Sequence, residues 1–72
     1  MTERADKKLS VRVLPWEGVG WGVDINHGNG KHDAYPVGPH EAAEAEAQRI
    51  RSGGAARTRE EVERSLKEAG LI

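Results

Sequence analysis

The spacing of the apolar residues changes near Gly38, and this change limits the folds that the chain can adopt. Between Leu9 and Val37 apolar residues recur at every second position, which places them on one face of a β-sheet. From Pro39 onward they recur every three or four positions, which places them along one side of a helix. The sequence therefore predicts an α+β fold in which a three-stranded antiparallel meander is packed by one helix and followed by a second, C-terminal helix (βββαα).

The chain has 72 residues, enough for one small domain. We expect this domain to span residues 9–72, after a disordered polar tail at residues 1–8 that lacks the apolar segment of a signal peptide. The pattern assigns the meander to residues 9–37, the first helix to 39–52, a flexible linker to 53–57 and the second helix to 58–70.

Turn and breaker residues set the expected limits of the strands. Pro15 has no amide hydrogen, so the first strand is expected to end before it, and the glycines within residues 16–20 permit a hairpin loop. The Asn29–Gly30 dipeptide is typical of a second hairpin, and Pro36 favours an edge position for the third strand. The expected strands are residues 10–14, 21–26 and 32–37.

Both helices carry terminal signals. Gly38 is expected to be the N-cap of the first helix, with Pro39 at its first position. Thr58 and Glu61 have the spacing of a capping box for the second helix. Gly70 is expected to end that helix in a left-handed conformation. The glutamates at 41, 44, 46, 60, 61, 63 and 68 are expected on helix surfaces, solvated or paired with arginine.

Composition narrows the function classes. The chain has 11 basic and 12 acidic residues, so it lacks the basic excess that is usual in nucleic-acid-binding domains. It has no cysteine, which is consistent with a cytoplasmic protein, and no apolar run long enough for a membrane span. The few Leu, Ile and Val residues indicate a thin core, and thin cores are often completed by dimerisation.

Short motifs resemble those of a bacterial family of small domains of unknown function. They are Val11-Arg12-Val13-Leu14-Pro15, Gly20-Trp21-Gly22-Val23, and Tyr35-Pro36-Val37-Gly38 before Glu41-Ala42-Ala43-Glu44-Ala45. The resemblance covers residues 10–52, and the run of basic and Ser residues that often fills the second hairpin of that family is missing. It implies a β-β-β-α order with a Gly-Trp-x-Val second strand, and no assigned chemistry.

Two groups of side chains are candidates for binding. Trp21 shares the parity of the core positions, whereas Trp16 follows a proline where no inward pattern requires it. Trp16 therefore either anchors an interface, in one apolar patch with Leu14 and Val19, or folds back over an open end of the core. The second group is basic and has the character of a phosphate-binding patch. It comprises Arg12, Arg49, Arg51, Arg57 and Arg59, with Lys7 and Lys8.

The sequence contains no pattern that indicates catalysis or a cofactor. Imidazole and carboxylate groups near the second hairpin could ligate a metal, but their spacing matches no metal motif, and we interpret them as a solvated turn. They are Asp24, His27, His32, Asp33 and His40.

We therefore predict a non-enzymatic interaction module that binds a protein partner or a second copy of itself. The alternative is a nucleic-acid-binding domain that uses the sheet face or the arginine window from Arg49 to Arg59. No cofactor, metal or membrane partner is expected.

Overall fold

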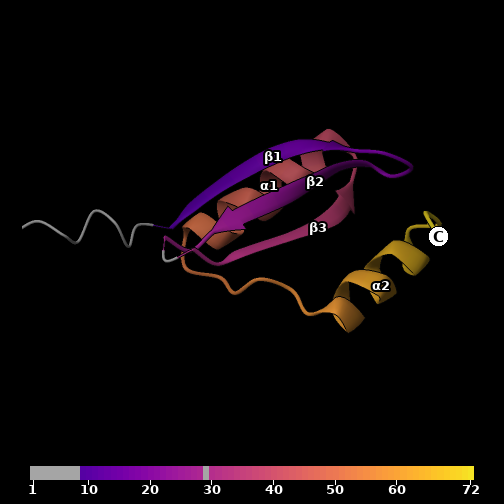
Figure 1. Ribbon diagram of the computed structural model, residues 1–72. Coiled ribbons are helices and arrows are strands. Elements are labelled where there is room, and N and C mark those ends of the chain that lie inside the picture. The colour runs from indigo at the N-terminus through magenta and orange to yellow at the C-terminus, as the bar shows by residue number, and fades with distance from the viewer. Residues whose placement is uncertain (1–8, 29) are drawn as a thin grey trace, which may run out of the picture.

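The computed structural model describes residues 9–28 and 30–72. The predicted tail at residues 1–8 and the Asn29 position of the second hairpin lie outside these residues. The described chain forms three strands followed by two helices, which confirms the βββαα order (Figure 1). The elements are β1 (Ser10–Trp16), β2 (Gly20–Asn26), β3 (His32–Gly38), α1 (His40–Arg51) and α2 (Arg59–Glu68).

The strands form one antiparallel sheet in the order β1-β2-β3, so β3 is an edge strand, as Pro36 predicts. The expected end of β1 before Pro15 is wrong, because pairing continues through Pro15 opposite Trp21 to Trp16 opposite Gly20. An edge strand tolerates proline, since every second amide of such a strand points away from its neighbour. In β3 a bulge at Val37 shifts the register, and Gly38 pairs with Trp21 instead.

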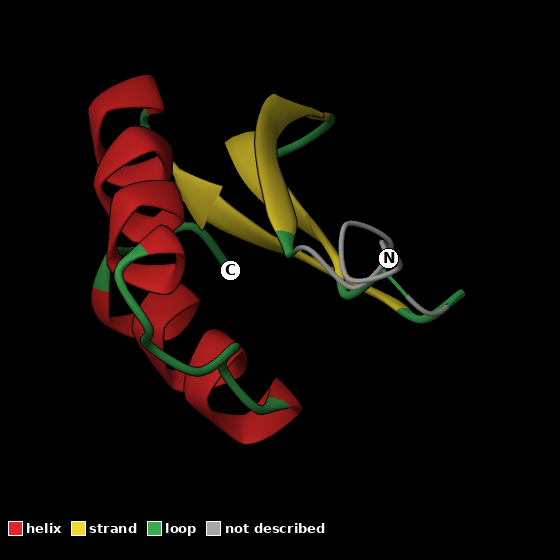
Figure 2. Cartoon of the chain, turned by 90° about the vertical axis from the view of Figure 1, so that its left-hand side faces the viewer, coloured by secondary structure: helices red, strands yellow, loops and turns green. Residues whose placement is uncertain are grey.

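The helices lie on one side of the sheet, and no described element covers its other side (Figure 2). Val23, Ile25, Ala43 and Ala47 have no exposed surface, so the alternating strand positions and the helical alanine stripe meet in one core. The remaining core side chains are Val11, Tyr35, Ile50, Val62 and Leu66. The predicted parity of the strands is therefore confirmed at the centre of the sheet, whereas Leu9 is exposed.

Helix α1 begins one residue later than expected. Pro39, not Gly38, is the N-cap, and its carbonyl accepts a hydrogen bond from the amide of Ala43. Gly38 has a φ of 142°, a value that side-chain-bearing residues rarely adopt, and it serves as the last residue of β3. The glycine thus provides the sharp change of direction between the sheet and the helix.

Helix α2 has the predicted capping residues, although its helical residues are 59–68 and not 58–70. The Thr58 hydroxyl accepts a hydrogen bond from the Glu61 amide, and the Glu61 carboxylate accepts one from the Thr58 amide, which completes the capping box. At the other end Gly70 has a φ of 76°, and the Leu71 amide donates to the carbonyl of Leu66. This is a Schellman ending, and its Leu71 side chain packs against the core.

Helix α2 packs mainly against β3 of its own chain, through Val62 and Leu66. Helix α1, by contrast, contacts all three strands. No helix in the described part of the chain has the length and apolar character that crossing a membrane requires.

Candidate functional site

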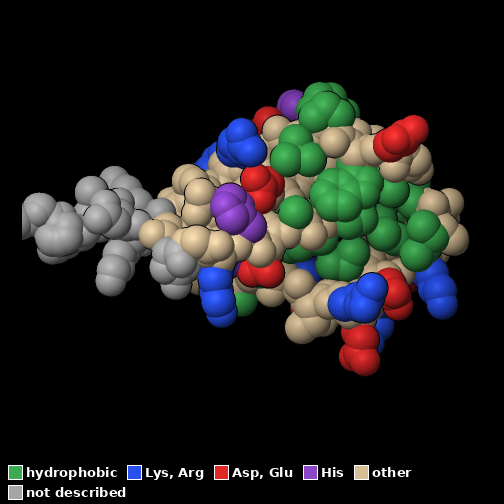
Figure 3. Space-filling model, viewed as in Figure 1, with side chains coloured by type: hydrophobic (Ala, Val, Ile, Leu, Met, Phe, Trp, Pro, Cys, Tyr) green, Lys and Arg blue, Asp and Glu red, His purple; other side chains and the backbone are tan. Residues whose placement is uncertain are grey.

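The sheet face opposite the helices, here called the open face, carries the strand residues whose parity is opposite to the core positions. Apolar side chains gather on one half of this face, and charged and histidine side chains lie on the other half (Figure 3). Its residues are Ser10, Arg12, Leu14 and Trp16 of β1, Gly22, Asp24 and Asn26 of β2, and His32, Ala34 and Pro36 of β3.

Trp16 dominates the apolar half. A β-carbon built at Gly22 would lie 2.5 Å from Trp16 Cε3 and 3.1 Å from the α-carbon of Pro36. The indole therefore lies across the glycine on β2, which buries Gly22 and leaves the ring half-buried. The sequence left open whether Trp16 anchors an interface or folds back over the core. Neither alternative describes it fully, because the ring packs on the sheet and is still partly exposed to solvent.

The other residues that the sequence grouped with Trp16 separate from one another. Leu14 pairs with Gly22 and lies beside Trp16 on the open face. Val19 in the first hairpin packs against the core instead, so the predicted patch of these three residues is wrong for Val19. Trp21 faces the core side but is only half-buried, and its ring meets the His40 ring edge-on at a centroid distance of 4.5 Å.

The polar half of the open face is compensated internally. Arg12 Nη2 donates to Asp24 Oδ2 at 3.1 Å, and His32 Nδ1 lies 3.5 Å from Asp24 Oδ1. The hydrogen bond from Arg12 is the main reason that the pKa of Asp24 lies below its ordinary value. The guanidinium of Arg12 is thus already paired with a carboxylate that stays ionised.

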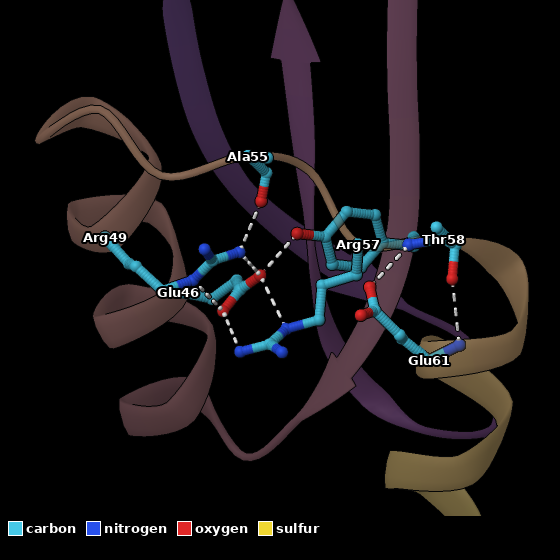
Figure 4. Close-up of polar contacts among 7 residues, drawn as sticks. Glu46, Arg49, Ala55, Arg57, Thr58 and Glu61 are labelled. Carbon is cyan, nitrogen blue, oxygen red and sulfur yellow. Dashed lines mark hydrogen bonds and ion pairs between the residues drawn. The ribbon is translucent and has the colours of Figure 1, made fainter.

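A second polar cluster lies on the helix side, around Glu46. This side chain is paired with arginine, one of the two alternatives expected for the glutamates, but it is only 7% exposed and does not lie on the helix surface. It accepts hydrogen bonds from Arg49 Nε at 3.1 Å and Nη2 at 2.8 Å, from Arg57 Nε at 3.2 Å and Nη2 at 3.3 Å, and from the Tyr35 hydroxyl (Figure 4). Arg49 Nη2 also donates to the Ala55 carbonyl at 2.7 Å. The Glu46 cluster thereby joins α1, β3 and the linker.

These contacts shift two pKa values in opposite directions. Burial alone raises the pKa of Glu46, but the hydrogen bonds from Arg49, Tyr35 and Arg57 outweigh it and hold the pKa at about 2. Burial, followed by the hydrogen bond to the Glu46 carboxylate, raises the pKa of Tyr35 to about 12. Glu46 is therefore ionised and Tyr35 neutral at ordinary pH, and neither group is poised for proton transfer near neutrality.

The other arginines of the predicted window, Arg51 and Arg59, lie apart from Arg49 and Arg57. Arg51 Nη2 donates to the carbonyl of Val11 at 2.7 Å, which joins the end of α1 to β1. Arg59 has no hydrogen-bond or ion-pair partner among the described residues, and it lies beside β3 at the start of α2. The window is therefore divided between a buried carboxylate, a strand carbonyl and solvent.

The histidine and aspartate residues near the second hairpin form separate pairs. His27 Nε2 lies 2.8 Å from Asp33 Oδ2, and His40 Nε2 lies 3.4 Å from Glu44 Oε2. Within residues 9–28 and 30–72 no three His, Cys, Asp or Glu side chains gather in a way that could hold a metal ion.

Sequence reasoning missed the burial of Glu46 and the contact of Trp16 with Gly22. The sequence did allow an arginine partner for Glu46, and Arg49 lies three residues further along the same helix face. The sequence carries no sign of the additional partners Tyr35 and Arg57, because both are eleven residues away and meet Glu46 only in the fold. No family model, curated protein or solved structure matches the chain, so the candidate site is defined by its geometry.

Proposed function

We propose that the protein is a non-enzymatic interaction module that binds a protein partner, or a second copy of itself, through the open face of its sheet. The main supporting observation is that Trp16 is held beside Leu14 and Pro36 on a sheet face that none of the described helices or strands covers. A large aromatic ring with limited freedom loses little entropy on binding, and such rings often dominate the energy of protein interfaces.

The arrangement of the polar half supports the same proposal. Arg12, Asp24 and His32 neutralise one another at the rim of the apolar half, so a partner that covers Trp16 does not have to desolvate an unpaired charge. A flat apolar centre beside a polar rim is the usual composition of a protein interface.

The arginines give the nucleic-acid alternative less support. Arg12 is paired with Asp24, Arg49 and Arg57 with Glu46, and Arg51 with a backbone carbonyl. Binding to phosphate would have to compete with these intramolecular contacts. If the alternative holds, fluorescence anisotropy at low salt will detect affinity for duplex or single-stranded DNA that falls steeply as salt is added.

Site-specific photo-crosslinking tests the protein-binding proposal. We would place a photoreactive phenylalanine analogue at Ala34, which lies on the open face, and at Gln48, an exposed position on the other side of the molecule, on α1. Crosslinks to a partner, or to a second copy, are expected from position 34 and not from position 48. Equal products from both positions would contradict the proposal, as would none from position 34.

Sedimentation velocity separates the two kinds of partner. If a second copy is the partner, the sedimentation coefficient will rise with concentration in the wild type and not in a Trp16→Ser variant. If the sedimentation coefficient is that of a monomer at every concentration, the partner is a different protein. The mass added in the crosslinked product would then differ from the mass of this chain.

A further inference from the structure

A cleft of about 370 Å³ lies between α1 and α2, with β3 as its floor. This volume is at the lower end of the range for small-molecule sites. Most of its wall is apolar and comes from Pro36, Val37, Ala42, Ala45 and Val62. One end of the cleft is formed by the Glu46 cluster, and the Ser65 side chain also lines it.

The charge that this cleft presents to solvent is positive. Among residues 9–28 and 30–72, Glu46 is the one acidic residue that lines the cleft, and its side chain is 7% exposed. The side chains of Arg49 and Arg57 also line it, and they are 37% and 43% exposed. Two guanidinium groups around one carboxylate leave one positive charge in excess, carried by the exposed groups.

Both guanidinium groups keep unused donors. Each has five N–H bonds, and both Arg49 and Arg57 contact Glu46 through Nε and Nη2. The Nη1 amino group of each arginine makes no hydrogen bond within the part of the chain that the structure describes. Arg49 Nη1 lies against the linker, because a β-carbon built at Gly54 would be 2.6 Å from it. An incoming anion would therefore bind at Arg57 Nη1, while Glu46 keeps its own hydrogen bonds.

A neighbouring cleft provides the contrast. It has a volume of about 400 Å³ and lies between β3 and α2, where Arg57 and Arg59 are accompanied by Asp33 and Glu63. Arg57 lines both clefts, but here Arg57 and Arg59 are accompanied by two exposed carboxylates, so the described residues give this cleft no excess of positive charge. The excess of positive charge distinguishes the cleft between α1 and α2.

We propose that the cleft between α1 and α2 binds a small amphiphilic carboxylate. Its carboxylate would accept hydrogen bonds from Arg57 Nη1, beside the positive charge of Arg49, and its short apolar chain would cover Val37, Ala45 and Val62. This site lies on the helix side of the sheet and does not depend on the interaction proposed for the open face.

A titration of the ¹⁵N-labelled full chain with sodium hexanoate, followed by NMR, tests the proposal. Hexanoate has about eight non-hydrogen atoms, which can support a Kd of about 1 mM. We expect saturable chemical-shift changes at the amides of Ala42, Ala45 and Val62. Acetate lacks the chain and 1-hexanol lacks the charge, so both are expected to bind at least about tenfold more weakly. Absence of saturable shifts with hexanoate, or equal binding of hexanol, would overturn the proposal.

Three variants assign the site. Arg57→Gln is expected to weaken hexanoate about tenfold, whereas Arg59→Gln removes the same charge next to the cleft and is expected to leave the Kd within about twofold. Ala45→Leu keeps both arginines and fills the cleft, so it is expected to abolish the shifts at Val62 while the amide spectrum of α2 stays native. Equal weakening by both glutamine variants, or unchanged binding to Ala45→Leu, would refute the site.

Discussion

The indole ring of Trp16 lies on the α-carbon of Gly22, so closely that a β-carbon at position 22 would be 2.5 Å from Trp16 Cε3. Glycine normally weakens a strand, because it is flexible and has no side chain to pack. Here the neighbouring tryptophan covers the exposed backbone in place of the missing side chain. The same contact holds Trp16 in a defined position on the open face, which connects the stability of the sheet to its proposed use.

Gly22→Ala is expected to destabilise the protein by about 2 to 3 kcal/mol, because the added methyl group overlaps Trp16 and the Tyr35 carbonyl oxygen, 2.6 Å away. Gly18→Ala is the control: it has a φ of 85° but no atom within 4 Å of the added carbon, so its cost is that of backbone strain, about 1 kcal/mol. Urea denaturation followed by circular dichroism measures both. A smaller loss for Gly22→Ala than for Gly18→Ala would contradict this placement of Trp16.

The free energy of unfolding is expected to decrease as the pH falls from about 5 to about 2. The pKa of Glu46 is lowered from 4.5 to about 2, so the unfolded state binds a proton at a higher pH than the folded state does. The stabilisation is complete above the pKa that Glu46 has in the unfolded state, 4.5, and is lost as the pH falls to its pKa in the folded state, about 2. Urea denaturation at several pH values measures this dependence.

A Glu46→Gln variant should flatten that pH dependence. It should also lose about 2 to 4 kcal/mol at pH 7, because two guanidinium groups then lack their carboxylate. Glu44→Gln on the exposed side of α1 is the matched control and should keep the slope of the wild type. The role assigned to Glu46 would have to be abandoned if the two variants gave the same pH profile.

At high pH, ionisation of the Tyr35 hydroxyl should decrease the free energy of unfolding. Its pKa is raised from 10.0 to about 12, so the folded state keeps its proton at a pH at which the unfolded state loses it. The stabilisation is therefore present below pH 10 and is lost between about 10 and 12. Tyr35→Phe should remove this high-pH loss, and ultraviolet absorbance at alkaline pH measures the ionisation of the hydroxyl directly. Ionisation of Tyr35 at an ordinary pH would disagree with its contact with Glu46.

Helix α2 should open more easily than α1, because it packs mainly against β3 whereas α1 packs against all three strands. Hydrogen exchange is expected to be faster for the amides of α2 than for those of α1. Leu66→Ala should increase this difference, since Leu66 is 5% exposed and is one of two buried side chains of that helix. Ser65→Ala, at an exposed position, is the control. Equal protection of both helices in the wild type would argue against separate opening of α2.

The Thr58 cap should contribute about 1 kcal/mol to the stability of α2. Thr58→Ala removes the acceptor for the Glu61 amide, whereas Thr58→Ser keeps it. Thermal denaturation should therefore rank the serine variant close to the wild type and the alanine variant below both. Equal melting temperatures of the two variants would contradict the cap.

The order of the elements and the ends of α2 could be predicted because their signals are local. Alternation from Val11 to Ile25, the alanine stripe of α1 and the capping residues Thr58 and Gly70 each act within a few residues of the chain. The end of β1 could not be read in this way. Whether Pro15 interrupts a strand depends on which neighbours that strand has, and this is a property of the whole sheet.

The sequence by itself determined which side chains alternate, which helical stripe is apolar and where α2 begins and ends, because short-range sterics and hydrogen bonding decide these features. Only the tertiary structure decided that Glu46 is buried and that Trp16 lies on Gly22. A carboxylate enters the interior only where cations and a hydroxyl from distant segments replace its water, and here Tyr35 and Arg57 come from β3 and the linker. An aromatic ring rests on a glycine only where pairing of two strands brings them together, and residue spacing alone does not specify such contacts.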